Sequence, residues 1–217
     1  MEPGGTSDAR LGNTSLRDYA DALASEIEAL DEKPVLLGHS MGGLLEQLLA
    51  ARGLARAAVL LKPASPAGII ALAPSVIRGF WSIQTKWRLW RNPMRQTRAE
   101  AAWSMLNCMP PDRNAAIPDR LVHESGCAAF EIGYWPLGSR KSTREAATEV
   151  KCPLLVIAGS EDRLTPASLV RKVADRYHAV SAFREFPGDA QWIVADLCWE
   201  LVAGEIGNWV QNQPAAN

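Results

Sequence analysis

The feature that most constrains the fold of this chain is an apolar run followed at once by a glycine-rich turn and a leucine-rich helix. The run is Pro34–Leu37 and the turn is Gly38-His39-Ser40-Met41-Gly42-Gly43. The turn fits Gly-x-Ser-x-Gly, in which a serine on a sharp strand-to-helix connection has its hydroxyl lifted clear of the backbone. Such a turn needs unusual backbone angles and close approach, so a Cβ at the glycine positions is expected to clash. The apolar residues that follow repeat with helical spacing: Leu44, Leu45, Leu48 and Leu49. The alternative is an ordinary glycine-rich connection between a strand and a helix.

Short apolar strands alternate with helices along the rest of the chain. The expected strands are 35–37, 57–61, 154–158 and 182–186, and the expected helices are 15–30, 166–177 and about 195–210. Thr14 and Ser15 supply a hydroxyl cap for the first helix, and Thr165 with Pro166 is the expected start of another. This alternation predicts an α/β fold with a mostly parallel sheet.

A long excursion separates the second expected strand from the third. A structureless loop of that length is improbable, so residues 63–149 are predicted to form a helical cap over residues 1–62 and 150–217. The excursion holds five of the eight tryptophans: Trp81, Trp87, Trp90, Trp103 and Trp135. These side chains either line a substrate pocket or, more simply, fill the core of the cap itself.

Composition excludes several classes of protein. The net charge is -1, which argues against nucleic acid or an anionic membrane as a partner, and no apolar run approaches a membrane span. The first ten residues are polar and do not resemble a secretory signal. The cysteines and histidines show no metal-binding spacing, so a cytoplasmic protein with reduced thiols and no cofactor is expected. The cysteines are Cys108, Cys127, Cys152 and Cys198, and the histidines are His39, His123 and His178.

With these features the chain resembles the α/β-hydrolase superfamily, in particular esterase- and lipase-like serine hydrolases with a helical cap, over about Ser15 to Trp209. Besides the Ser40 turn, the resemblance rests on Gly159–Pro166 and on Phe186–Trp192. It implies that Ser40 is a nucleophile and that Asp162, in the loop after the third strand, is the triad acid. Glu161 is the neighbouring alternative, and Asp162 could instead be a turn residue or a helix cap. A serine nucleophile argues against haloalkane dehalogenases and epoxide hydrolases, which use an aspartate at the same turn.

The residue that departs from this pattern is Gln191, which stands where the family's catalytic histidine is expected. A serine hydroxyl needs a base, and glutamine has no useful proton affinity near pH 7. Other candidate bases are weak. His39 is expected to point away from the pocket of Ser40, and His178 to lie at the far edge of the sheet. His123 could hang over the pocket from the cap, and Asp189 is expected to form a turn. The chain is therefore expected to be weakly active or inactive.

The resemblance also implies an oxyanion hole, with the Met41 N–H as one donor. The second donor belongs to a loop among strands that precede the serine strand in this family. Only 33 residues precede Pro34, and residues 1–13 resemble the end of such a loop. The serine strand is then an open edge of the sheet, which makes a homo-oligomer possible.

Three functions remain open at this point. The first is a serine hydrolase that acts on carboxylic esters or related small acyl compounds and is impaired by Gln191. The second is an inactive, hydrolase-like protein that binds a ligand in the old pocket. The third is a truncated fragment without function.

Overall fold

The computed structural model describes residues 8–71, 73–110, 112, 117–136, 143, 147–193 and 199–213. Four parallel strands form one sheet in the order β1-β2-β5-β6. They are β1 (Val35–His39), β2 (Ala57–Leu61), β5 (Leu154–Gly159) and β6 (Ser181–Phe186). The predicted α/β class and parallel sheet are confirmed, and β1 is an outer strand, as expected.

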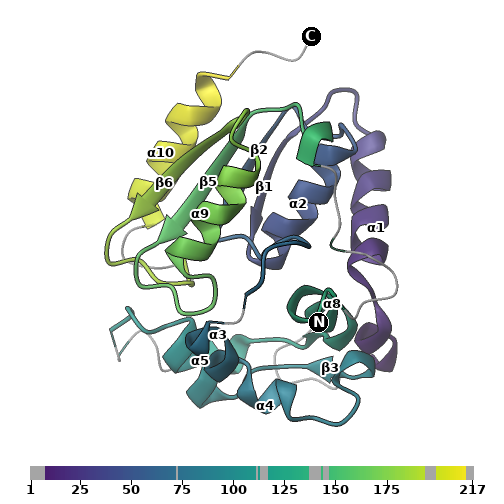
Figure 1. Ribbon diagram of the computed structural model, residues 1–217, viewed down its shortest axis with the longest axis vertical. Coiled ribbons are helices and arrows are strands. Elements are labelled where there is room, and N and C mark those ends of the chain that lie inside the picture. The colour runs from purple at the N-terminus through teal and green to yellow at the C-terminus, as the bar shows by residue number, and fades with distance from the viewer. Residues whose placement is uncertain are drawn as a thin grey trace.

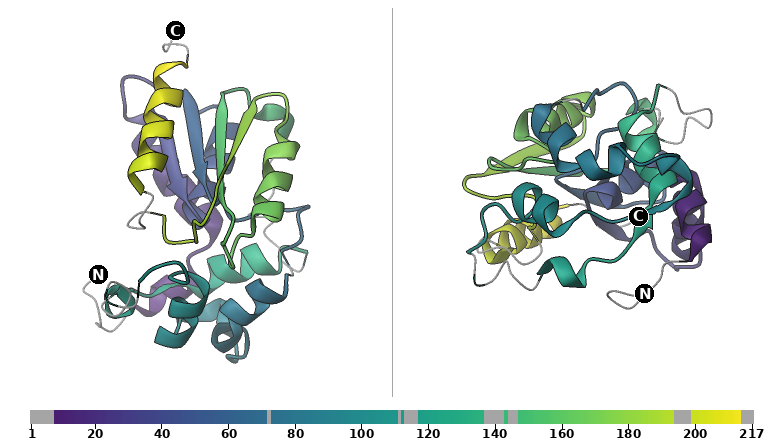
Figure 2. Two further views of the ribbon diagram at one scale, coloured as in Figure 1. Left: turned by 90° about the vertical axis from the view of Figure 1, so that its left-hand side faces the viewer. Right: turned by 90° about the horizontal axis from the view of Figure 1, so that it is seen from below.

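Helices cover both faces of this sheet (Figures 1 and 2). On one face lie α1 (Leu16–Glu28), α2 (Met41–Ala51) and α9 (Ala167–Arg176), and on the other lies α10 (Trp199–Gln211). The expected start of α10, residues 195–198, lies outside the described residues. None of the described helices has both the length and the apolar character that crossing a membrane requires.

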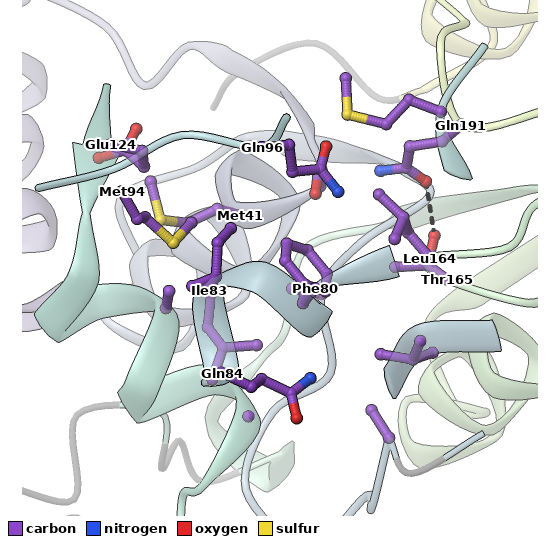
Figure 3. A pocket seen from close by; sticks show the side chains of 18 of the residues that line it. Met41, Phe80, Ile83, Gln84, Met94, Gln96, Glu124, Leu164, Thr165 and Gln191 are labelled. Carbon is purple, nitrogen blue, oxygen red and sulfur yellow. Dashed lines mark hydrogen bonds between the residues drawn. The ribbon is translucent and has the colours of Figure 1, made fainter. Parts of the chain in front are cut away.

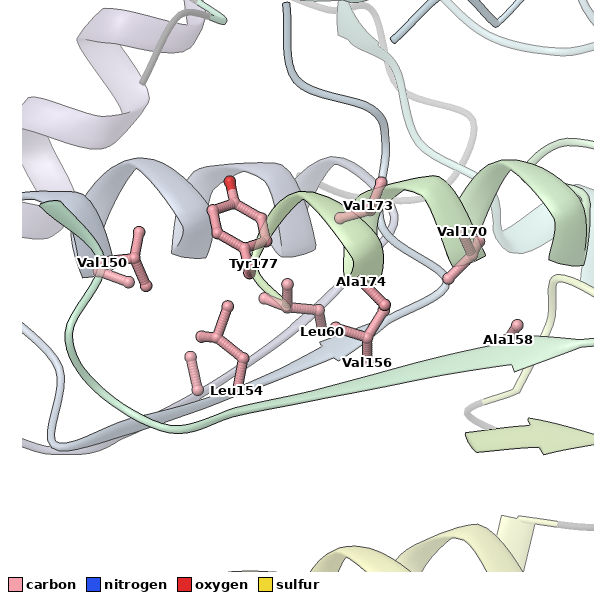
Figure 4. Close-up of a cluster of buried hydrophobic side chains, with 11 residues drawn as sticks. Leu60, Val150, Leu154, Val156, Ala158, Val170, Val173, Ala174 and Tyr177 are labelled. Carbon is pink, nitrogen blue, oxygen red and sulfur yellow. The ribbon is translucent and has the colours of Figure 1, made fainter. Parts of the chain in front are cut away.

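The alternation of side chains along the strands builds two separate cores. Leu60, Leu154 and Val156 pack against α2 and α9 in the cluster of Figure 4. Their sequence neighbours point to the opposite face and pack with α10: these are Val59, Leu61, Leu155 and Ile157. Both faces of β2 and β5 are therefore apolar, which explains why these strands read as continuous hydrophobic runs.

Helix α1 begins as the sequence predicts. The Ser15 hydroxyl accepts a hydrogen bond from the Asp18 N–H, and the Asp18 carboxylate accepts one from the Ser15 N–H. This reciprocal capping box satisfies two N–H groups at the helix start. Leu16 and Ala20 then pack against Leu44 and Leu48 of α2.

Most of the chain between β2 and β5, called the β2–β5 insertion below, gathers at the end of the sheet where β1 meets α2, and its last turn, η3, lies at the opposite end against α2 (Figure 1). Its described elements are α3 (Pro74–Gly79), α4 (Trp81–Gln84), η2 (Leu89–Arg91), β3 (Pro93–Met94), α5 (Arg98–Ser104), α7 (Ile117–Arg120), β4 (Glu124–Ser125), α8 (Gly126–Gly133) and η3 (Ala147–Glu149). The η1 turn (Ala9–Asn13) near the N-terminus contacts β3, β4 and α8.

Candidate active site

Ser40 occupies a sharp turn between β1 and α2. Its backbone has φ 54° and ψ -116°, a conformation that a residue with a side chain rarely adopts. The turn is held by two backbone hydrogen bonds, from the Ser40 N–H to the Leu61 carbonyl (3.0 Å) and from the Ala64 N–H to the Ser40 carbonyl (2.9 Å). Strain of this kind persists only where the surroundings hold it in place, and it concentrates at functional sites.

The glycines around Ser40 differ in what they do. A Cβ on Gly38 would lie 2.5 Å from the Gly42 backbone, and one on Gly43 would lie 2.9 Å from Pro63 Cβ. A Cβ on Gly42 would meet nothing within 4 Å. The expected clash is confirmed at Gly38 and wrong at Gly42, because Gly42 faces open space, and the positive φ falls on Ser40 itself.

Asp162 lies in the loop between β5 and α9, and it is buried, whereas its neighbour Glu161 is exposed. Its Oδ1 accepts hydrogen bonds from the Leu164 and Thr165 N–H groups, both at 2.8 Å. Burial raises the pKa of the Asp162 carboxyl, while these hydrogen bonds and the nearby Lys62 ammonium act in the opposite direction. The carboxyl is thus held in one orientation by the backbone.

Gln191 lies between Ser40 and Asp162. In the amide orientation of Figure 3, Thr165 Oγ1 donates to Gln191 Oε1 at 2.9 Å. That orientation turns the amide oxygen toward the Asp162 carboxylate and the nitrogen toward the Ser40 hydroxyl, so we assign the reverse. Nε2 then donates to Asp162 and to Thr165 Oγ1 (2.9 Å), and Oε1 accepts from Ser40 Oγ at 3.2 Å. The structure therefore brings all three predicted residues into one hydrogen-bonded chain.

Thr165 belongs to this chain of contacts and was missed as a site residue. Its hydroxyl donates to Asp162 Oδ2 at 2.8 Å. The prediction that Thr165 caps the following helix is wrong, because α9 begins after Pro166, and the Thr165 side chain turns toward Asp162 and Gln191 instead. The only signal in the sequence was its distance of three residues from Asp162.

Strand alternation suggested that His39 points away from the pocket of Ser40, and this prediction is wrong: His39 is among the residues that line the cavity beside Ser40. The loop after β6 crosses the end of β1, and His39 Nε2 donates to the Gln191 backbone carbonyl at 2.8 Å. Burial, against the hydrogen bond to the Gln191 carbonyl and with a smaller contribution from the charge of Lys62, lowers the pKa of His39 to about 4, so the ring is neutral near pH 7. A carbonyl can only accept, which fixes the proton on Nε2. His39 thus supports the backbone of Gln191.

Asp189 is not the simple turn residue that was expected. Gly188 supplies the left-handed turn residue with φ 73°, and Asp189 is fully buried in an ion pair with Lys62 (2.8 Å). Lys62 Nζ also donates to the Ala190 carbonyl. The ion pair fastens the loop that carries Gln191 to the end of β2.

The remaining histidines lie apart from Ser40. His178 is exposed after α9, where Nδ1 contacts the Asp175 carbonyl at 3.2 Å. His123 is half-buried just before β4 and is not among the residues that line the cavity beside Ser40. Among the described residues, neither histidine stands in for the missing base.

A cavity of about 450 Å³ opens beside Ser40, between the sheet and the β2–β5 insertion. Most of its wall is apolar, and Figure 3 shows Met41, Phe80, Ile83 and Met94 facing Leu164 and Gln191 across it. Met41 is also the first residue of α2, so its N–H lies at a helix N-terminus beside Ser40. The arrangement offers a serine hydroxyl and a backbone donor to an apolar compound.

No tryptophan of the β2–β5 insertion lines this cavity. Trp81 and Trp87 are exposed, so both explanations given from the sequence are wrong for them. Trp90 is partly exposed, and its ring packs against Phe130 of α8 with 5.5 Å between the ring centres, so packing within the insertion holds for this side chain. Trp103 lies between two guanidinium groups, with the Arg78 and Arg163 Cζ atoms 4.1 and 4.8 Å from its ring centre. Residue type alone did not reveal which face of the insertion each ring occupies.

Solved structures with similar folds agree with this description. The monoacylglycerol lipase of Paleococcus ferrophilus has 24% identity and a TM-score of 0.66, with 94% of this chain and 77% of that chain covered. A thermophilic esterase from Thermogutta terrifontis has 18% identity and a TM-score of 0.67, with 99% and 79% covered. A serine hydrolase involved in carbazole degradation has 14% identity and a TM-score of 0.58, with 92% and 73% covered. At these identities the likeness shows the fold.

A search among curated proteins found no significant match. The model of the alpha/beta hydrolase family, in contrast, matches residues 4–200, which is most of the chain. The matched region contains Ser40, Asp162 and Gln191. The chain belongs to the alpha/beta hydrolase family.

Proposed function

We propose that this chain is a serine hydrolase for carboxylic esters or related small acyl compounds, slowed by the glutamine at position 191. In this mechanism Ser40 Oγ attacks the acyl carbonyl while its proton passes to a water molecule, because Gln191 cannot accept it. The Met41 N–H stabilises the oxyanion, the acyl–oxygen bond of the ester breaks, and the alcohol leaves after taking a proton from water. Asp162 orients residue 191, and water releases the acyl group. The β2–β5 insertion serves as the cap that encloses the substrate, and no cofactor takes part.

The observation that carries the proposal is the bridge formed by Gln191. Its amide contacts both Ser40 Oγ and the Asp162 carboxylate, which are the two contacts that a triad histidine makes. An amide can orient the Ser40 hydroxyl by accepting its proton in a hydrogen bond, but it cannot remove that proton. The bridge therefore supports a site arranged for acyl transfer that has one oxyanion donor, the Met41 N–H, and no base.

The decisive experiment compares hydrolysis of p-nitrophenyl butyrate by the wild-type chain and by Gln191→His. General-base catalysis typically contributes about 10²- to 10⁴-fold, so we expect a gain in kcat/KM of that order. Gln191→Met is the matched control, because it has a similar size and no base. Ser40→Ala in the Gln191→His background should abolish the gain.

A second function, ligand binding without turnover, is favoured by the same glutamine. The cavity can hold an apolar acyl group whether or not Ser40 reacts. If Gln191→His stays inactive while folded, and a medium-chain alkyl amide binds to the wild-type chain in calorimetry, this second function replaces the first.

A cytoplasmic location is part of the proposal. Cys152, near the start of β5, is a free thiol, and reduced thiols are typical of that compartment.

A further inference from the structure

The outer surface of residues Trp81–Arg91 combines three exposed tryptophans with three exposed basic side chains. This stretch, called the Trp81–Arg91 segment, contains α4 and η2 and lies at the end of the molecule farthest from the C-terminus (Figure 1). The Trp81, Trp87 and Trp90 side chains are 60%, 85% and 41% exposed. Large apolar side chains that stay exposed close together in the chain mark candidate interaction sites.

Within the described part of the chain, the basic side chains of the segment form no ion pair. Lys86, Arg88 and Arg91 are all exposed, and no carboxylate among the described residues pairs with them. From Arg78 to Arg98 the sequence contains six basic residues and no acidic one. In space one described carboxylate, that of Glu100, accepts hydrogen bonds from the Ser82 N–H and hydroxyl, so the segment carries three basic side chains against this one acid. The net charge of -1 therefore conceals a local excess of positive charge, and the expectation of no membrane partner rested on that net charge.

The inner side of the same segment belongs to the cavity. Ile83, Gln84 and Leu89 line it, while their neighbours along the chain expose tryptophan and basic side chains to solvent. Arg88 has φ 54°, so the backbone bends sharply between α4 and η2. One short segment thus separates the cavity beside Ser40 from the outside surface.

We propose that the Trp81–Arg91 segment docks the protein on an anionic lipid surface. Tryptophan prefers the boundary between lipid headgroups and acyl chains, and lysine and arginine are drawn to anionic headgroups. An acidic protein would satisfy the charges but would give the protruding Trp81 and Trp87 no apolar layer to enter, so a lipid surface fits both features. Docking places the wall of the apolar cavity against the layer in which apolar esters collect.

The test is cosedimentation of the chain with vesicles of phosphatidylcholine alone and of phosphatidylcholine mixed with phosphatidylserine. We expect binding to the mixed vesicles, weakened by salt, with a blue shift of tryptophan emission. In the charge variant Lys86→Gln/Arg88→Asn/Arg91→Gln, affinity should fall about a hundredfold, since each basic residue near such a surface contributes about fivefold. Asparagine replaces Arg88 because it tolerates a positive φ.

A second variant, Trp81→Ala/Trp87→Ala, should lose about tenfold or more in affinity because less apolar surface enters the lipid. Trp199→Ala is the matched control, since Trp199 is 50% exposed on α10, away from the segment. No binding, equal binding to both vesicle types, or equal loss in the control would overturn the proposal. So would a dimer in sedimentation velocity that the Trp81→Ala/Trp87→Ala variant dissolves, because the occupant is then a second copy. None of these measurements needs hydrolysis, so the outcome is independent of the proposed reaction.

Discussion

Lys62 Nζ and Asp189 Oδ2 form an ion pair of 2.8 Å, and solvent reaches neither side chain. The pair joins Lys62, the residue directly after β2, to the loop that carries Gln191. Two charges in such a place stabilise the fold only while they remain together, because either one alone would be an uncompensated buried charge.

Removing one member of this pair should therefore be costly. We expect Lys62→Met to lower the free energy of unfolding by about 3–5 kcal/mol. The double variant Lys62→Met/Asp189→Leu should lose clearly less, because no charge is left unpaired. Urea denaturation followed by circular dichroism measures both, and equal losses in the two variants would contradict the role of the pair.

His39 should stay neutral far below the usual pH of histidine titration. Its pKa is lowered to about 4, so between about pH 6.5 and 4 the unfolded chain binds a proton that the folded chain does not. The free energy of unfolding should accordingly fall as the pH is lowered through this range. Nitrogen NMR should show the Nε2–H tautomer of His39 at pH 6. His39→Gln keeps a donor for the Gln191 carbonyl and should remove this part of the pH dependence.

The titration of Glu46 should make the free energy of unfolding depend on pH in the opposite direction to that of His39. It is buried on α2, and burial raises the pKa of its carboxyl to about 9, against a smaller effect of the Gly38 backbone. The folded chain keeps this proton between about pH 4.5 and 9 while the unfolded chain loses it, so stability should fall as the pH rises. Glu46→Gln should flatten the dependence and stabilise the protein at pH 8. A steeper or unchanged slope in thermal melts would show that Glu46 is ionised in the folded state.

The two glycines flanking Ser40 should respond oppositely to alanine. Gly38→Ala places a Cβ against the Gly42 backbone and should cost about 3 kcal/mol. Gly42→Ala enters open space in the first turn of α2 and should be neutral or stabilising by up to about 1 kcal/mol. Chemical denaturation of the two variants side by side is sufficient, and equal destabilisation would mean that the turn rejects any Cβ.

Much of the sheet was predictable from local pattern. Strands such as Ala57–Leu61 are continuous apolar runs bounded by polar residues or proline, and their observed bounds differ from the predicted ones by at most two residues. Helix α1 was predicted for the same reason, since its capping box and apolar face lie within one stretch of sequence. The apolar pattern of an element records which of its faces are buried: one face in α1, and both faces in β2 and β5.

What could not be predicted depends on contacts between distant segments. The Thr165 side chain contacts Gln191, which lies 26 residues later in the chain. Asp189 forms its ion pair with Lys62, which lies 127 residues earlier. The prediction for the exposed tryptophans was wrong for a different reason. Most tryptophan side chains are largely buried, and the sequence alone does not show which ones are exposed. The proximity of Gln191 to Ser40 was inferred through the family resemblance, and nothing in the residues alone required it.

Strands β2 and β5 are neighbours in the sheet, yet the chain between them runs from Leu61 to Leu154. The entropy lost in closing such a loop grows only with the logarithm of its length, so doubling the insertion would cost about 0.6 kcal/mol. Pairing of the two strands requires contact between residues far apart in the sequence, which lowers the folding rate more than it lowers the free energy of unfolding. Added length in the insertion beyond Ala64, whose N–H holds the turn at Ser40, should therefore cost the sheet little stability, so the size of the cavity can change while the sheet stays the same.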